Sequence, residues 1–126
     1  MSTLAVGTIK SASSAAPVFQ NTSGTEIGQI CKMWVNFDGT GTLAVRDSFN
    51  VSSVTDQGTG QYIINIDNDM ANINYAVVLG GPTDGGNGNL GPFANATTVG
   101  TIDCFNYSQS GSFQDISSFN AAIFGD

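Results

Sequence analysis

The side chains that most often perform catalysis are poorly represented in this sequence, which contains no histidine. The Ser-His-Asp and Cys-His arrangements of nucleophilic catalysis are therefore not available to it. Two of its ten acidic residues would suit glycoside hydrolysis if they lay at the right separation. Aspartate is also favoured in turns, where it bonds to the nearby backbone. The acids mostly have such turn surroundings, so we expect no catalytic residues and no enzyme; examples are Asp38, Asp56, Asp67, Asp69 and Asp84.

Metal-binding side chains are equally sparse. Without histidine, the two cysteines do not complete a tetrahedral zinc site. Residues 67–69 and 84–89 are rich in oxygen ligands that calcium accepts, but neither has the spacing of a recognised loop or a downstream bidentate glutamate. Asp, Asn and Gly are also the commonest turn formers, which favours ordinary turns over calcium sites. We therefore expect neither a metal nor a cofactor.

The cysteines, Cys31 and Cys104, are expected to be free thiols, with a disulfide as the alternative. The first residues lack the basic start and apolar core of a secretory signal, which predicts synthesis in the cytosol. Disulfides are rare in proteins made there.

Charge excludes two classes of partner. The net charge is −7, and the only basic residues are Lys10, Lys32 and Arg46. Binding to nucleic acid or to an anionic membrane surface relies on many cations, so we expect neither. No run approaches the ~20 apolar residues of a membrane helix. Charged residues make up only 10% of the chain, against about 25% in an ordinary domain. A surface this poor in charge is common where a protein packs against copies of itself.

Short alternating segments indicate an all-β fold. Cys31, Met33, Val35 and Phe37 share one face of a predicted strand because side chains alternate along a strand. Three further strands follow, each after a Gly-containing or polar turn. We predict an antiparallel meander from these four strands; they cover residues 31–37, 43–46, 49–54 and 62–66.

The remaining strands are predicted at residues 75–79, 98–107 and 117–124. The first is compact and apolar, which suggests burial on both faces or at a subunit contact. Between it and the second, residues 80–92 are too rich in Gly and Pro for a regular element and are expected to form a long loop. No segment has the 3.6-residue period of an amphipathic helix. The fold class is therefore an all-β antiparallel sandwich, rich in meander and with a jelly-roll arrangement as one form of it.

The first part of the chain has a different composition. Residues 1–28 are rich in Ser, Ala, Thr and Gly, with small apolar islands and one predicted strand at residues 4–9. We interpret residues 1–28 as an extended arm that reaches a neighbouring molecule, with a frayed terminus as the alternative. Residues 29–126 then form the sandwich domain.

Trp34 is on the opposite face of its strand from Met33 and Val35. An aromatic residue of this size must be covered by a second sheet, an arm or another subunit, or be displayed for binding. Packing in a core or between subunits is the favoured interpretation. Several phenylalanines near the C-terminus add more apolar surface than two short strands bury, which favours oligomerisation; these are Phe105, Phe113, Phe119 and Phe124.

The middle of the chain resembles a module of bacteriophage virion proteins, including those of cyanophages, that is usually labelled tail-fibre-like. The resemblance covers roughly residues 24–80, and its parts occur in the same order. They are W-V-N-F-x-G-T at residues 34–40, S-F-N-V-S-S at 48–53, D-x-G-T-G-x-Y at 56–62 and N-Y-A-V at 74–77.

This resemblance implies a non-enzymatic virion structural protein, made in the host cytoplasm and assembled as a homotrimer. It implies no catalytic or binding residue. The arm would contact other virion proteins of the tail or capsid, and the loop at residues 80–92 would touch a host receptor or glycan. Because the chain has no repetitive shaft, two positions stay open. One is a short fibre or tail-fibre-like adhesion module; the other is a capsid decoration (cement) protein or head fibre.

Overall fold

The computed structural model describes residues 3–12, 17–82 and 89–125 of the 126-residue chain. Its internal contacts divide the chain into an N-terminal unit, Met1–Ile30, and a larger unit, Cys31–Asp126. We treat the two units separately. The described residues contain strands and turns but no helix, and therefore no helix able to span a membrane.

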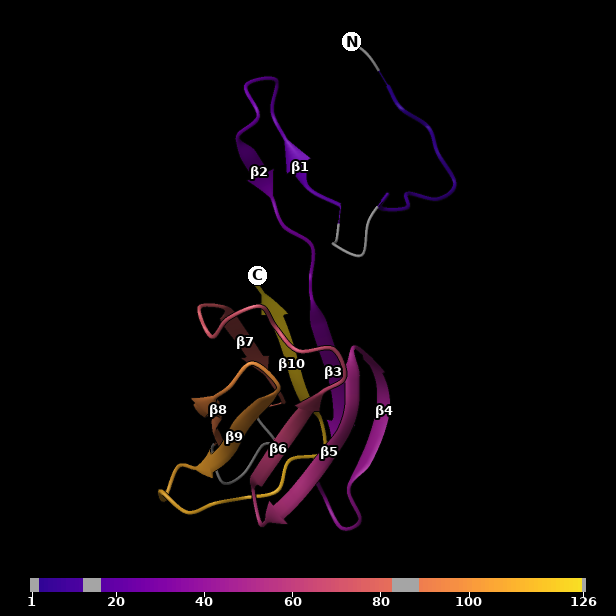
Figure 1. The fold of residues 1–126 in the computed structure, drawn as a ribbon. Coiled ribbons are helices and arrows are strands. Elements are labelled where there is room, and N and C mark those ends of the chain that lie inside the picture. The colour runs from indigo at the N-terminus through magenta and orange to yellow at the C-terminus, as the bar shows by residue number, and fades with distance from the viewer. Residues whose placement is uncertain (1–2, 13–16, 83–88, 126) are drawn as a thin grey trace. The chain divides into compact units, whose positions relative to one another are not determined.

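The larger unit is a sandwich of two four-stranded antiparallel sheets (Figure 1). The first sheet consists of β4 (Ala44–Phe49), β3 (Met33–Asp38), β10 (Phe119–Phe124) and β7 (Ala76–Gly80), in that spatial order. The second consists of β5 (Val51–Gly58), β6 (Gln61–Ile66), β9 (Thr101–Ser108) and β8 (Asn89–Thr97). The predicted all-β sandwich is confirmed.

The core lies between the central strands of the two sheets. In β3 the burial pattern alternates strictly, as predicted, with Met33, Val35 and Phe37 inside. The same alternation in β6 and β9 supplies the facing side chains. Rings dominate the centre: Phe37 stacks on Phe119 with centroids 4.9 Å apart, and Tyr62 meets Phe37 edge-on at 5.0 Å. The other fully or nearly fully buried apolar residues are Ile64, Ile66, Met70, Ile102, Cys104, Ile116, Ala121 and Ile123.

The predicted four-strand meander is wrong in one respect, because the chain changes sheets after β4. The hairpin of β3 and β4 belongs to the first sheet, whereas the hairpin of β5 and β6 belongs to the second. Asn50 makes the corner with a positive φ of 57°. Asparagine tolerates this left-handed backbone better than other residues with a Cβ. The predicted strand at 49–54 therefore divides at this residue, with Phe49 ending β4.

The side chain of Asn50 also stabilises this corner by hydrogen bonds. Its side-chain amide donates to the carbonyl of Lys32 at 3.1 Å and to that of Asn68 at 3.1 Å. Its Oδ1 accepts the backbone N–H of Asn68 at 2.8 Å. Three segments that are distant in the chain are thereby joined at one residue.

We expect Asn50→Ala to lower the free energy of unfolding by about 2–4 kcal/mol, from lost hydrogen bonds and an unfavourable left-handed alanine. Asn50→Gly separates the two causes, because glycine accepts the φ but makes no side-chain bonds. Urea unfolding of both variants measures the difference. Equal losses in the two variants would show that the backbone conformation contributes nothing.

Two edge strands depart from the sequence-based expectations. The predicted strand at 75–79 is β7, which lies at the edge of the first sheet and pairs only with β10, so it is not buried on both faces. The predicted loop at 80–92 ends earlier than expected, since β8 begins at Asn89 and includes Pro92. A proline is tolerated there because β8 is also an edge strand. The β8 segment turns at residues 98–100 into β9, which shortens the strand predicted at 98–107.

The N-terminal unit contains one small hairpin. Its strands are β1 (Phe19–Gln20) and β2 (Glu26–Gly28). Asn21 shapes the turn, because its Oδ1 accepts the backbone N–H groups of Ser23 and Thr25. The strand predicted at residues 4–9 is wrong: those residues are exposed and form no strand.

Burial of Cys104 in the sandwich core raises the pKa of its thiol from 9.0 to about 12, with Asp103 adding to the effect. Below pH 9 the thiol is protonated in both the folded and the unfolded state. Between the two pKa values only the unfolded chain releases the proton. The contribution of this thiol to the free energy of unfolding is therefore fully present below pH 9 and is lost as the pH rises towards 12.

We expect the free energy of unfolding to fall by up to about 1.4 kcal/mol per pH unit above pH 9 through this group. Tyr62 acts in the same direction above pH 10, because desolvation raises its pKa as well. Cys104→Ala should flatten the slope while lowering stability at neutral pH. Urea unfolding over a series of pH values tests this, and an unchanged slope in the variant would contradict the assignment.

Candidate functional site

The outer face of the first sheet carries a row of apolar side chains that crosses all four strands. Trp34 of β3 lies opposite Phe49 of β4 on one side and Ala122 of β10 on the other. Val78 of β7 lies opposite Ala122. We call these four residues the apolar row. Trp34 is 37% exposed, Phe49 54% and Val78 56%, so a substantial part of each side chain faces solvent.

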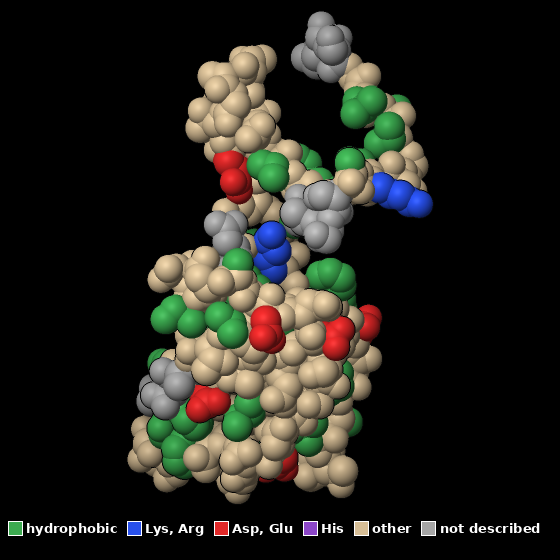
Figure 2. All heavy atoms as spheres, viewed as in Figure 1, with side chains coloured by type: hydrophobic (Ala, Val, Ile, Leu, Met, Phe, Trp, Pro, Cys, Tyr) green, Lys and Arg blue, Asp and Glu red, His purple; other side chains and the backbone are tan. Residues whose placement is uncertain are grey.

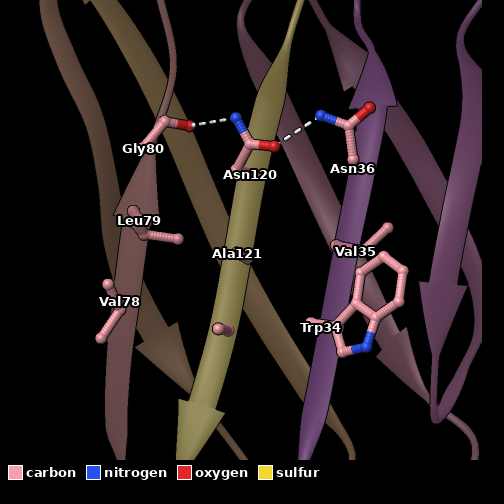
Figure 3. Close-up of a pocket in the computed structure, with 9 residues that line it drawn as sticks. Trp34, Val35, Asn36, Val78, Leu79, Gly80, Asn120 and Ala121 are labelled. Carbon is pink, nitrogen blue, oxygen red and sulfur yellow. Dashed lines mark hydrogen bonds between the residues drawn. The ribbon is translucent and has the colours of Figure 1, made fainter. Parts of the chain in front are cut away.

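A polar row lies next to the apolar row, one pleat further along the strands. It consists of Asp47, Asn36, Asn120 and Gly80, which are paired in this order across the sheet. The Asn36 amide donates to Asn120 Oδ1 at 2.5 Å, and the Asn120 amide donates to the Gly80 carbonyl at 3.4 Å (Figure 3). Asn36 Nδ2 also donates to Ser118 Oγ at 2.9 Å. Asn36, Asn120 and Gly80 therefore form a hydrogen-bonded ladder across three strands of the sheet.

An ion pair lies beyond the polar row. Arg46 Nη2 donates to Asp38 Oδ2 at 2.9 Å and also to the carbonyl of Ser117. Hydrogen bonds from Thr40 lower the pKa of the Asp38 carboxyl, and Arg46 adds to this effect. The pair is solvent-exposed, so its contribution is mainly to fix the position of the Arg46 side chain.

A shallow hollow of about 380 Å³ lies over these strands. Figure 3 shows the Trp34 indole on one side and Val78 on the other, with the ladder of Asn36 and Asn120 along one end. The hollow exists because Ala122, between the two larger side chains of its row, is small. It is a place where a protruding group of another molecule fits.

The hollow is lined mainly by apolar and amide groups. The residues that line it carry indole, aliphatic and amide groups, and none carries a carboxylate, thiol or hydroxyl. Such a lining supplies neither a nucleophile nor a proton donor for general acid catalysis. Its apolar area and its position at the centre of an exposed sheet suit a partner surface.

The outer face of the second sheet has an aromatic cluster of its own. Tyr107 and Phe113 stack with centroids 4.7 Å apart, Phe105 lies 5.6 Å from Phe113, and Phe93 lies 6.1 Å from Tyr107. Four aromatic rings, from β8, β9 and the segment after β9, thus pack against one another. A smaller hollow of about 200 Å³ adjoins Phe105; polar side chains line most of it, among them Gln57, Gln61 and Asp103.

A buried polar network connects the end of the core to the segment before β10. Asp115 Oδ1 accepts the Tyr62 hydroxyl at 3.1 Å and the Gly60 backbone N–H at 2.7 Å. Asn106 is fully buried and donates its amide to the Gln114 carbonyl at 2.8 Å. The Oδ1 of Asn106 and the Oε1 of Gln114 have no hydrogen-bond partner. These residues hold the chain in place and lie apart from the apolar row.

Of the acidic residues predicted in turns, Asp67 lies in a bend, Asp38 ends β3, Asp56 lies within β5, and Asp84 lies outside the described residues. Asp38 Oδ1 accepts the backbone N–H of Thr40, and Asp56 Oδ1 accepts that of Gly58, both at 2.9 Å. Asn68, between Asp67 and Asp69, bonds to Asn50. The other oxygen-rich segment, residues 84–89, lies almost wholly outside the described residues. Among those described, no three His, Cys, Asp or Glu side chains cluster as metal ligands would.

The remaining sequence candidates separate in space. Cys31 and Cys104 are both free, as predicted, with Cys104 buried and Cys31 partly buried. Trp34 is not in the core of this chain, so cover by an arm or another subunit, or display for binding, stays a prediction. The four C-terminal phenylalanines divide as well: Phe119 is in the core, Phe105 and Phe113 are in the outer aromatic cluster, and Phe124 is exposed.

No protein-family model, curated protein or solved structure matches this chain.

Sequence reasoning found Trp34 but missed its neighbours in the apolar row. Val78 and Ala122 lie in predicted strands, and alternation alone assigns each a face. Which strands are adjacent depends on pairings between segments more than 40 residues apart, such as Ala122 with Val78. No local signal in the sequence contains that information.

Proposed function

We propose that this chain is a non-enzymatic structural protein of a bacteriophage particle, a short fibre or tail-fibre-like adhesion module that assembles as a homotrimer. The observation that carries the proposal is the uncovered apolar row. Contiguous apolar surface on a soluble protein marks a site of contact with other molecules, because its exposure to water is unfavourable. The resemblance of residues 24–80 to tail-fibre-like modules supplies the phage context.

The distribution of charge supports a structural role. The carboxylates are scattered over the visible face of the sandwich and form no cluster there (Figure 2). With 10% charged residues the surface is largely hydroxyl, amide and backbone, which favours close packing with other subunits. The hollow beside Trp34 lacks catalytic groups, in keeping with a surface that binds.

The oligomeric state tests the proposal directly. We expect sedimentation equilibrium of the full chain to give three times the 13.0 kDa mass of one chain. Val78→Glu places a charge in the apolar row and should dissociate the trimer. Ile73→Glu is the matched control, because Ile73 is 60% exposed, comparable to Val78, but lies in the bend before β7 and in none of the paired strands. A wild-type protein that is monomeric at all concentrations would refute the proposal.

A capsid decoration protein is the second candidate. The observation that favours it is the N-terminal unit, whose apolar side chains are exposed and are suited to lie along a shell of other subunits. The number of copies per particle distinguishes the two. Quantitative gel analysis of purified virions should give a handful of copies for a fibre and hundreds for a decoration protein. Absence of the chain from virions would contradict both.

A further inference from the structure

The N-terminal unit, Met1–Ile30, leaves its apolar side chains in water. Every residue described in it is exposed except Pro17, which is partly buried. A two-stranded hairpin such as β1–β2 is at best marginally stable alone. The unit therefore needs a surface to lie on, and it brings seven large apolar side chains to that surface: Leu4, Val6, Ile9, Val18, Phe19, Ile27 and Ile30.

The hollow over the first sheet is suited to apolar side chains. Its floor is Ala122 and its sides are Trp34 and Val78. At its polar end the amide nitrogens of Asn36 and Asn120 already donate within the sheet. A hydroxyl-rich ligand such as a glycan requires free donors and acceptors at its binding site. Few remain here, so an apolar group fits the hollow better than a sugar does.

Net charge favours the N-terminal unit over a second sandwich as the occupant. In the N-terminal unit the charges of Lys10 and Glu26 cancel, so the net charge of −7 resides on the sandwich. Two sandwiches meeting face to face would repel each other. A neutral segment from another molecule contacts the same face while its own sandwich stays further away, where salt screens the repulsion.

A short connection, residues 29–32, joins β2 to β3. Residue 32 is already attached to the first sheet, since its backbone N–H donates to the carbonyl of Ile123 at 2.9 Å. Residues 29–32 include no Gly, Pro, Asn or Asp, the residues that most readily reverse the chain. A return over the chain's own β3 would therefore have to begin at or before Gly28.

We propose that the apolar row of one copy is covered by the N-terminal unit of a second copy, with Phe19 and Ile27 at the hollow beside Trp34. This inference rests on the proposed oligomeric structural role and names the contact that holds the oligomer together. Each copy both donates its N-terminal unit to a neighbour and accepts one from another neighbour. Three copies can therefore be linked in a closed ring.

Trp34 reports on this contact directly, because it is the only tryptophan in the chain. In a dilution series of the full-length protein, we expect its fluorescence to shift to shorter wavelength as the oligomer forms. Ile27→Ser and Phe19→Ser should weaken association at least tenfold and keep Trp34 in its water-exposed state at the same concentrations. Ile73→Ser is the control and should behave as the wild type, since Ile73 is also a large exposed apolar residue, at 60% against 67% for Ile27 and 44% for Phe19, but belongs to the larger unit.

Cross-linking decides which copy supplies the segment. A photoreactive phenylalanine analogue at position 19 is introduced, and isotopically light and heavy copies are mixed when dilute and then concentrated. We expect cross-links between the light N-terminal unit and heavy peptides containing Trp34 or Val78. Cross-links within single copies only would overturn the inference and assign the face to the chain's own segment.

Other results would overturn it in distinguishable ways. An oligomer in which Trp34 stays exposed would exclude the apolar row as the interface, yet leave the proposed oligomeric role standing. A shifted Trp34 in an oligomer that tolerates Ile27→Ser and Phe19→Ser would assign the contact to sandwich surfaces. A wild-type monomer would refute the proposed function together with the inference.

Discussion

Replacing Gly60 with alanine is expected to lower the free energy of unfolding by about 3–5 kcal/mol, as the sum of backbone strain and overpacking. Gly60 has a φ of +64°, a region that alanine enters only with strain. A Cβ there would also lie 2.5 Å from the Gln114 nitrogen and 2.8 Å from the Asn106 carbonyl oxygen. Both are backbone atoms of the packed network around Asp115, so neither moves away easily.

Gly41→Ala provides a control with almost the same backbone angle. Its φ is +63°, but a Cβ at this position meets nothing within 4 Å. It should therefore cost only the backbone strain, about 1–2 kcal/mol. Urea unfolding followed by Trp34 fluorescence measures both variants. If the two losses were equal, the close approach at Gly60 would have no energetic consequence.

Phe119→Ala is the second substitution with a large expected effect. Phe119 is fully buried, stacks on Phe37 at 4.9 Å and meets Tyr62 edge-on at 5.6 Å. Its removal leaves a cavity between the two sheets where the three rings pack. Truncation of a buried phenylalanine costs about 3–5 kcal/mol through lost burial and the cavity that remains.

Phe124→Ala is the matched control, because Phe124 belongs to the same strand, β10, but is 39% exposed. It should change the free energy of unfolding by less than about 1 kcal/mol. The test is a comparison of urea midpoints at equal slope, which keeps the change attributable to stability. A loss at Phe119 no greater than at Phe124 would contradict its place at the centre of the core.

Local patterns predicted the strands of the sandwich centre well. The alternation in residues 33–37 and 62–66 indicated which side chains face inward, and the structure buries Met33, Phe37, Tyr62 and Ile64 accordingly. This success has a physical cause, because the two-residue period of a strand follows from its backbone geometry alone. Aspartates in turns were recognised for a similar reason, since their bonds reach residues only two positions away.

Local patterns gave wrong predictions where the position of a strand in the sheet depended on which other strands pair with it. The segment at 75–79 is apolar enough for a buried strand, yet β7 lies at a sheet edge because only β10 pairs with it. Residues 89–92 have the composition of a loop, yet they belong to β8, where an edge position tolerates Pro92. Composition does not specify which neighbours a strand acquires.

The sequence by itself determined that this is a β protein of low charge, with no histidine for catalysis and with a large aromatic residue, Trp34, turned away from its neighbours. Only the tertiary structure decided what lies around Trp34. The pairing of β3 with β4 and β10, and of β10 with β7, brings Phe49, Ala122 and Val78 into one row with Trp34. These pairings join distant segments, so they depend on how the whole chain packs, whereas residue alternation depends only on the local backbone.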